Sequence, residues 1–356
     1  MAGPSPYAEV EPLSKPVQEL VLDAVGDELP QRYVYKGGDG VIDASFPLLE
    51  VPLIDLGLLT SSSSNIGTGE ELKKLQSALS TCGCFQAINH GITSSFLDEV
   101  QGVAKQFFSL PMEEKQKYSR TVDDIEGYGN DTVLSEHQTL DWTDRLYLIV
   151  NPEDKRKLNF WPQKPANFRE ILHEYTTKLG MLTELILKAM AKSLSLEEKC
   201  FLNQYGEGAT MIARFNLYPP CPRPDLILGV KPHADGSAIT FLLQDNEVEG
   251  LQVLKDDHWF RVPIIPHALF INVGDQAEIM SNGMFKSPVH RVVTNSERER
   301  ITLAVFCIPE SSKEIGPVEE LINEKRPRLY KKVKNYVDIY FQNYQLGKRP
   351  IEAAKV

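Results

Sequence analysis

The sequence predicts an α+β fold in which helices pack around a β-sandwich or jelly-roll barrel. Helical patterns prevail between residues 70 and 196, whereas short β-rich runs separated by Gly, Pro, Asp and Asn follow residue 208. About eight short strands at such spacing are typical of a sandwich or barrel. Hydrophobic residues make up 42% of the 356-residue chain, which is enough for a sizeable core.

Helices and irregular segments make up the predicted first part of the chain. Pro16 suits the first turn of a short helix, and Leu72, Leu75 and Leu79 recur at helical spacing. We expect a helix from about 16, a buried strand at 51–56 and a serine-rich surface loop at 61–65. Residues 70–118 should form two amphipathic helices with a strand at 84–89 between them. An irregular region at 120–165 and a long helix from 167 to about 196 should follow.

Strands bounded by turn residues make up the predicted second part. They lie at 211–218, 226–233, 238–244, 251–254, 259–262, 269–273, 289–293 and 301–308. A last helix is expected at about 333–344, before Gly347. Helices first and strands second predict an architecture in which helices pack on a β core.

Composition and charge argue against several classes of protein. A net charge of −11 disfavours nucleic-acid binding, which needs a basic surface. No apolar run approaches the roughly 20 residues that span a bilayer, and the acidic, proline-containing start lacks the pattern of a signal or transit peptide. The five scattered cysteines predict reduced thiols in a cytoplasmic protein. The sequence has no Walker loop and no Gly-x-Ser-x-Gly elbow.

Three side chains in the second half have the spacing of a metal site. His233 and Asp235 are two residues apart, so they face the same side of a strand. His290 follows far enough along the chain for it to return beside them round a sheet. Two histidines and a carboxylate can occupy one face of an octahedral ion, as in non-haem Fe(II) enzymes that activate O₂. His-x-Asp alone is weak evidence, but both histidines lie at predicted strand ends, where small-molecule sites form.

Arg300 and Thr302 form a second pair with a spacing of two. From one strand face they offer a cation and a hydroxyl to a carboxylate-bearing cosubstrate. A cation inside a barrel is unfavourable unless it is paired. A bound dicarboxylate would be that partner, and the alternative is an internal ion pair with Asp275 or Glu278.

Several longer motifs occur in a fixed order along the chain. They include Val51-Pro52-Leu53-Ile54-Asp55, Asn89-His90-Gly91, Asn216-Leu217-Tyr218-Pro219-Pro220, His233-Ala234-Asp235, Gly250-Leu251-Gln252 and His290-Arg291. In this order, from about residue 17 to 345, the chain resembles the plant 2-oxoglutarate- and Fe(II)-dependent dioxygenases, especially the senescence-related, norcoclaurine-synthase-like and opiate O-demethylase-like members. The resemblance implies a double-stranded β-helix (jelly roll) with surrounding helices. Its expected parts are an N-terminal helical and mixed region at 1–200, a core at 201–315 and a C-terminal segment at 316–356 whose helix covers the mouth of the site.

The resemblance also implies roles for single residues. The triad would bind Fe(II), and Arg300 and Thr302 would hold the distal carboxylate of 2-oxoglutarate. Tyr218 would donate its hydroxyl to that carboxylate, and Asn216 would lie near the metal-bound end. The family usually has Ser where this chain has Thr302, which keeps the hydroxyl and adds a methyl. O₂ is the implied second cosubstrate and ascorbate an expected cofactor.

Substrate contacts are expected from positions around the triad. By position these are Arg214, Phe306, Ile308, Tyr128, Arg145, Tyr147 and Phe341. Phe306 either stacks on an aromatic substrate or belongs to plain core, and Arg214 either binds a carboxylate or phenolate or forms an internal salt bridge. We expect a monomer that hydroxylates or O-demethylates a mid-sized, largely apolar plant metabolite (an alkaloid, flavonoid or phenylpropanoid). A carboxylated hormone is the alternative substrate.

Two other functions are compatible with such a fold. One is a protein that binds a small molecule without oxidative turnover, and the other is a non-oxidative condensation, suggested only by the norcoclaurine-synthase-like relatives. A decayed site would be expected to have lost at least one polar residue. The complete set, with Arg300 and Thr302 beside the triad, therefore favours an active oxygenase.

Overall fold

The computed structural model describes residues 15–23, 31–37, 42, 45–60, 66–121, 124–130, 138–345 and 348–356. The expected loop at 61–65 lies outside these residues. The α-helices are α1 Val17–Asp23, α2 Leu56–Leu59, α3 Ile66–Thr81, α4 Ser94–Phe108, α5 Met112–Gln116, α6 Phe168–Ser193, α7 Cys200–Tyr205, α8 Asp275–Met280 and α9 Tyr336–Gln345. Short 3-10 helices lie at Gln31–Tyr33, Glu153–Lys155, Glu319–Leu321 and Pro350–Ala354.

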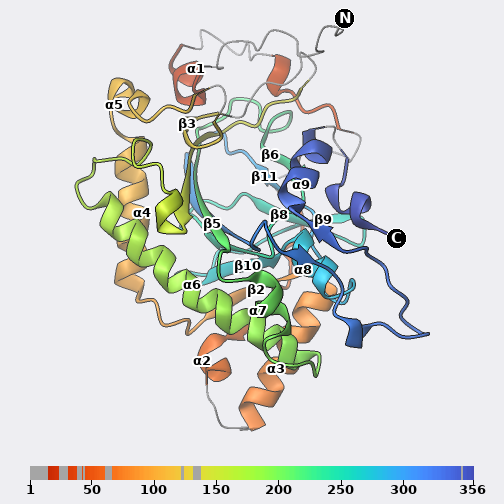
Figure 1. Ribbon diagram of the computed structural model, residues 1–356. Helices are drawn as coiled ribbons and strands as arrows, with labels where there is room; N and C mark the ends of the chain where they lie inside the picture. The colour runs from red at the N-terminus through yellow and green to blue at the C-terminus, as the bar shows by residue number, and fades with distance from the viewer. Residues whose placement is uncertain are drawn as a thin grey trace, which may run out of the picture.

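The strands form two main sheets (Figure 1). The larger has the order β1-β2-β10-β7-β12-β5-β4-β3, and the smaller has the order β6-β11-β8-β9. Within them β1 and β2 are parallel, and the other pairs are antiparallel. The bounds are β1 Leu53–Asp55, β2 Cys84–Ile88, β3 Gly127–Gly129, β4 Asp144–Asn151, β5 Thr210–Tyr218, β6 Leu228–His233, β7 Ile239–Leu243, β8 Leu251–Lys255, β9 His258–Arg261, β10 Leu269–Val273, β11 His290–Val293, β12 Arg300–Ile308, β13 Glu314–Ile315 and β14 Val333–Lys334.

The strands predicted after residue 208 are confirmed as β5 to β12, and the long helix is confirmed as α6. One expectation was wrong, because the region 120–165 is not irregular throughout. It contains β3 and the eight-residue β4, which extend the large sheet beside β5. The last helix also begins later than expected, at Tyr336, since Val333 and Lys334 belong to β14.

Helices cover one face of the large sheet (Figure 1). The helix α4 begins at an N-cap, where the hydroxyl of Thr93 accepts from the backbone N–H of Phe96. The ring centroid of Phe107 in α4 lies 6.0 Å from that of Phe168 in α6. The centroid of Phe168 in turn lies 5.3 Å from that of Phe215 in β5. These buried rings join both helices to the sheet and form part of the main core.

A second, smaller apolar cluster contains residues from both sheets. It includes Tyr218 and Phe270 from the large sheet and Val230, Leu251 and Val292 from the small one. The inner faces of the sheets therefore pack against each other, as in a jelly roll.

All five cysteines are free thiols, as expected. Within the described part of the chain, no helix combines the length and the apolar character required to cross a membrane.

Candidate active site

The predicted triad comes together at the end of the small sheet. His233 ends β6, His290 begins β11, and the two residues are paired in register across these strands. The Nε2 atoms of both histidines lie 3.6 Å from Oδ1 of Asp235. One ligand atom from each residue lies within 4.8 Å of the others, which is a spacing that can hold a metal ion. Among the described residues this is the only such group of His, Cys, Asp and Glu.

Hydrogen bonds orient each side chain of the triad. The Nδ1 atom of His233 lies 2.9 Å from the carbonyl of Lys231, and that of His290 lies 3.1 Å from the carbonyl of Pro288. A carbonyl accepts only from a protonated nitrogen, so both Nε2 lone pairs are left for a metal. Asn272 donates to the other oxygen of Asp235, Oδ2, at 2.8 Å.

The protonation states of His233 and Asp235 suit the binding of a cation. Burial and the neighbouring His290 lower the pKa of His233 to about 3, so its ring is neutral at physiological pH. Burial by itself raises the pKa of Asp235, but His290 and His233 leave it below its usual value. Neutral imidazoles and an ionised carboxylate are the forms that bind a metal ion.

A pocket beside the triad is lined by both residues predicted to hold a carboxylate, Arg300 and Thr302. The guanidinium of Arg300 is buried, and its Nε donates to the carbonyl of Val248 at 3.1 Å. Among the residues that the structure describes, its two terminal nitrogens form no hydrogen bond of standard geometry, and Tyr218 and Asp245 are the neighbouring groups that favour its charged form. The alternative internal pairs were wrong, because Asp275 accepts from Tyr336 and Glu278 from Ser287 and Tyr330.

Tyr218 and Asn216 line the same pocket from the neighbouring strand. The register pairs Arg300 with Tyr218 and Thr302 with Asn216 across β12 and β5. The guanidinium of Arg300 lies 5.3 Å from the centre of the Tyr218 ring, and the amide of Asn216 donates to the hydroxyl of Thr302 at 3.3 Å. The four residues thus form one polar surface near the triad.

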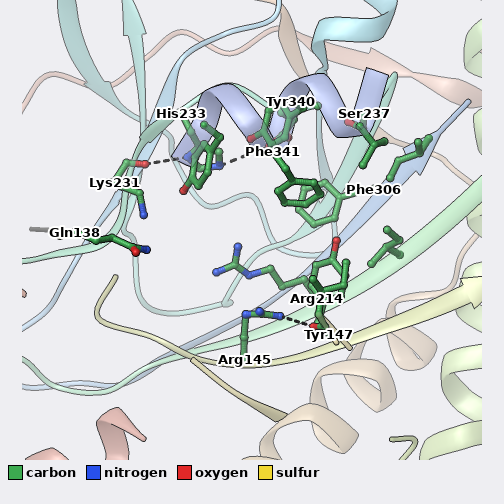
Figure 2. A pocket seen from close by; sticks show the side chains of 17 residues that line it. Gln138, Arg145, Tyr147, Arg214, Lys231, His233, Ser237, Phe306, Tyr340 and Phe341 are labelled. Atoms are coloured by element: carbon green, nitrogen blue, oxygen red, sulfur yellow. Dashed lines mark hydrogen bonds and ion pairs between the residues drawn. The ribbon is translucent and has the colours of Figure 1, made fainter. Parts of the chain in front are cut away.

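A second pocket (Figure 2) adjoins the first at the triad, and both are lined by Arg214, His233, Asp235 and Phe306. Six of the seven residues predicted to contact the substrate line it, together with His233 and Asp235. These six are Arg145, Tyr147, Arg214, Phe306, Ile308 and Phe341. Figure 2 shows the rings of Phe306 and Phe341 together, with Lys231 to their left in this view and Arg214 below them near Arg145 and Tyr147.

The seventh residue, Tyr128, lies elsewhere and corrects the prediction. Its ring is buried 5.8 Å from Phe107 of α4, and its hydroxyl contacts the sulfur of Met112. The strand β3 turns this side chain toward the helices, because Tyr128 pairs with Leu146, which belongs to the same core. A pattern of one tyrosine between two glycines does not tell which face of a strand the ring occupies.

Several lining residues were missed by the sequence analysis. Lys231 lies two residues before His233 on β6, and that spacing alone would have placed it on the same face. Tyr340 and Tyr344 are one turn apart on α9, beside Phe341, so helical spacing would have grouped them. Ile125 and Gln138 come from the region between α5 and β4 and had no signal in the sequence.

Comparison with known proteins agrees with this geometry. Residues 51–164 match the non-haem dioxygenase in morphine synthesis N-terminal family, and residues 197–309 match the 2OG-Fe(II) oxygenase superfamily. Protein SRG1 of Arabidopsis thaliana is 37% identical over 96% of this chain and 96% of its own length. Codeine O-demethylase of Papaver somniferum is 39% identical over 92% of this chain and 91% of its own.

The likeness extends to a solved structure. JOX2, crystallised in complex with 2OG, Fe and JA, is 34% identical and superposes with a TM-score of 0.84 over 97% of this chain and 98% of its own. The match spans the helices and both sheets and confirms the predicted jelly-roll fold. Together with the two family matches and the relatives of similar length, it shows that the chain belongs to the plant family of 2-oxoglutarate- and Fe(II)-dependent oxygenases.

Proposed function

We propose that this dioxygenase binds Fe(II) through His233, Asp235 and His290 and oxidises a mid-sized, largely apolar plant metabolite. In this assignment Arg300 and Thr302 bind the distal carboxylate of 2-oxoglutarate. The observation that carries the assignment is the buried guanidinium of Arg300, whose terminal nitrogens form no ion pair and no hydrogen bond of standard geometry with the described residues. A carboxylate matches such a paired donor set in charge and geometry.

The reaction follows from what the bound groups supply and what the chain controls. With iron and 2-oxoglutarate bound, O₂ can oxidise a substrate C–H bond while 2-oxoglutarate is converted to succinate and CO₂. The triad side chains hold the metal, and their hydrogen bonds to Lys231, Pro288 and Asn272 fix their orientation. A substrate that fills the pocket against its apolar walls would exclude water from the reacting atoms. Oxidation at a methoxy carbon would end in demethylation.

The walls of the substrate pocket support a largely apolar substrate. Ile212, Phe306, Ile308, Val337 and Phe341 supply aliphatic and aromatic surface. Relatives of similar length include codeine O-demethylase, flavonol synthase 1 and a flavonoid 7-O-demethylase. An alkaloid, flavonoid or phenylpropanoid is the class that we propose on this basis, with hydroxylation or O-demethylation as the outcome.

A second candidate, a carboxylated substrate, is favoured by the charge of the same pocket. Its lining includes the cations Arg145, Arg214 and Lys231, whereas Asp235 is the lone acidic lining residue that the structure describes. Lys231 also contacts Asp141 at 3.4 Å, so part of its charge is balanced. An apolar body with one anionic group would fit both the rings and the cations.

The oligomeric state, the compartment and the parts of the chain belong to the same proposal. We propose a monomer in the cytoplasm, in which ascorbate keeps the iron reduced. We also propose that residues 1–200, 201–315 and 316–356 are the structural parts of the chain. The position of α9 against the substrate pocket supports a covering role for the last of them.

The test is turnover of candidate substrates. Purified protein with Fe(II), ascorbate, 2-oxoglutarate and O₂ is incubated with neutral and carboxylated plant metabolites, while product mass and succinate are measured together. We expect a product that gains one oxygen or loses a methylene, with matching succinate. Succinate without product would support the iron site and exclude the compounds tested. Neither signal, with a confirmed iron load, would contradict the oxygenase and favour a binding protein.

A further inference from the structure

Two of the triad side chains lie on a short stretch that we call the ligand segment, residues 233–236. On one side it is paired with β11, which carries His290. On the other side it contacts α9. The hydroxyl of Tyr340 in α9 donates to the carbonyl of Ala234 at 2.9 Å, between His233 and Asp235. A helix from the C-terminal part of the chain is thus bonded directly to the main chain that presents two metal ligands.

The ring of Tyr340 also lies against Gly236, at the end of the ligand segment. A Cβ atom at position 236 would lie 2.6 Å from Cγ of Tyr340 and 2.7 Å from Cδ2, closer than any real contact allows. The backbone of Gly236 does not have positive φ, so an alanine is disfavoured there by the ring rather than by conformation. The glycine therefore allows α9 to approach the ligand segment.

The same helix forms a wall of the substrate pocket. Tyr340, Phe341 and Tyr344 all line it. The rings of Tyr340 and Tyr344 are stacked at 5.7 Å with 14° between their planes, and Tyr344 meets His233 edge-on at 6.2 Å. Nζ of Lys231 lies 5.1 Å from the centre of the Tyr344 ring. The helix α9 thus contacts His233 itself and, on either side of it in the chain, Lys231 and Ala234.

We propose that Tyr340 is a positioning residue that holds the ligand segment in place from the substrate side of the pocket. The proposal rests on the proposed function, since it assumes that His233 and Asp235 bind the metal. Because the ring and hydroxyl of Tyr340 connect α9 to this segment, a displacement of α9 moves two ligands together. A substrate that contacts Phe341 or Tyr344 therefore acts on the metal site through the same helix.

The first test is the variant Tyr340→Phe, which removes the bond to Ala234 and keeps the ring on Gly236. Co(II) binding is measured anaerobically with 2-oxoglutarate present, from the visible absorption of the bound ion, alongside the melting temperature. We expect Co(II) binding to weaken about three- to ten-fold, the equivalent of one lost hydrogen bond, and the visible spectrum to change. The control is Tyr330→Phe, because that buried hydroxyl donates to Glu278 instead. It should lower the melting temperature and leave Co(II) affinity within two-fold.

A second variant, Gly236→Ala, tests the contact with the ring. It should weaken Co(II) binding at least as much as Tyr340→Phe. The double variant Gly236→Ala/Tyr340→Ala should be no worse than Tyr340→Ala alone, because the added methyl then has no ring to meet.

Three results would overturn the proposal. They are unchanged Co(II) affinity and spectrum in Tyr340→Phe, an equal loss in Tyr330→Phe, or additive losses in the double variant. Failure of the proposed function looks different, because the wild-type protein itself would then bind no Co(II).

Discussion

At the scale of single residues, the buried positive charge of Arg300 needs a partner of opposite charge. Its Nε has a carbonyl partner, Val248, but a carbonyl carries no net charge. Asp245 favours the charged form of Arg300 electrostatically, but its own hydrogen bonds come from the backbone N–H groups of Glu247, Val248 and Ile301. A dicarboxylic cosubstrate would therefore supply the missing partner for the terminal nitrogens of Arg300.

Replacing this residue is the direct test of its role. Arg300→Gln should raise the KM for 2-oxoglutarate about 30-fold or more, because a buried charge pair loses one member. The measurement is succinate formation against 2-oxoglutarate concentration. Arg298→Gln is the matched control, since that exposed side chain pairs with Glu247 at the surface, and it should leave the KM unchanged. An unaltered KM in Arg300→Gln would show that the cosubstrate binds elsewhere.

Arg214 separates the two candidate substrate classes. Arg214 lines both pockets, but the carboxylate of 2-oxoglutarate is assigned to Arg300 and Thr302, so Arg214→Gln should leave 2-oxoglutarate turnover in the absence of substrate intact. It should raise the KM of a carboxylated substrate about ten-fold or more, since an ion pair is lost, and leave that of a neutral one within about two-fold. Steady-state kinetics on any metabolite that is turned over make the comparison. If a carboxylated substrate is oxidised unchanged, the pairing with Arg214 is wrong.

At the scale of elements, the neighbouring strands β12 and β5 line both pockets, the one proposed for the cosubstrate and the one proposed for the substrate. Along the inner face of β12, Arg300 and Thr302 lie at the cosubstrate end and Phe306 and Ile308 at the substrate end. The opposite residues of β5 follow the same order, from Tyr218 and Asn216 through Arg214 to Ile212. The two-residue period of a strand keeps each set on one face, and this alternation could be predicted from the sequence.

The adjoining strand β4 could not be predicted in the same way. It begins with Asp144 and Arg145, and buried charges are unusual in a strand. Asp144 is tolerated because it accepts from the backbone N–H groups of Val17 and Gln18, more than 120 residues away in the chain. Such a distant partner leaves no local pattern at the charged start of β4, although the run Leu146-Tyr147-Leu148-Ile149-Val150 that follows is itself typical of a strand.

A close approach between β6 and β5 offers a test of an element. A Cβ at Gly229 would lie 2.7 Å from Cδ1 of Tyr218. Gly229→Ala should therefore displace the Tyr218 ring, destabilise the fold by about 1–3 kcal/mol and raise the KM for 2-oxoglutarate. Thermal unfolding and succinate kinetics measure the two effects. Gly102→Ala in α4 is the control, since its Cβ would meet only Nε2 of Gln106 at 3.9 Å, and it should stabilise the protein slightly. Wild-type stability and KM in Gly229→Ala would contradict this packing.

At the scale of the whole molecule, the site depends on parts that are far apart in the sequence. The small sheet carries the triad histidines, the large sheet carries Arg300 and Arg214, and α9 supplies lining residues of the pocket proposed for the substrate. A spacing of two indicated His233 with Asp235 and Arg300 with Thr302, and a position at the end of a predicted strand indicated His290. Local spacing places Lys231 on the face of His233 and groups Tyr340 with Tyr344, but the packing of α9 against β6 joins distant segments and is not visible in a local pattern.

The central claim is that the triad and Arg300 together form an Fe(II) and 2-oxoglutarate site. An anaerobic titration tests it most directly, because chelation of Fe(II) by a 2-oxo acid gives a visible charge-transfer band. The wild-type protein should develop this band only when both Fe(II) and 2-oxoglutarate are present. His290→Ala should abolish it, and Arg300→Gln should require about 30-fold or more 2-oxoglutarate for the same intensity. A wild-type protein that gives no band, or a His290→Ala variant that gives the full band, would contradict the account.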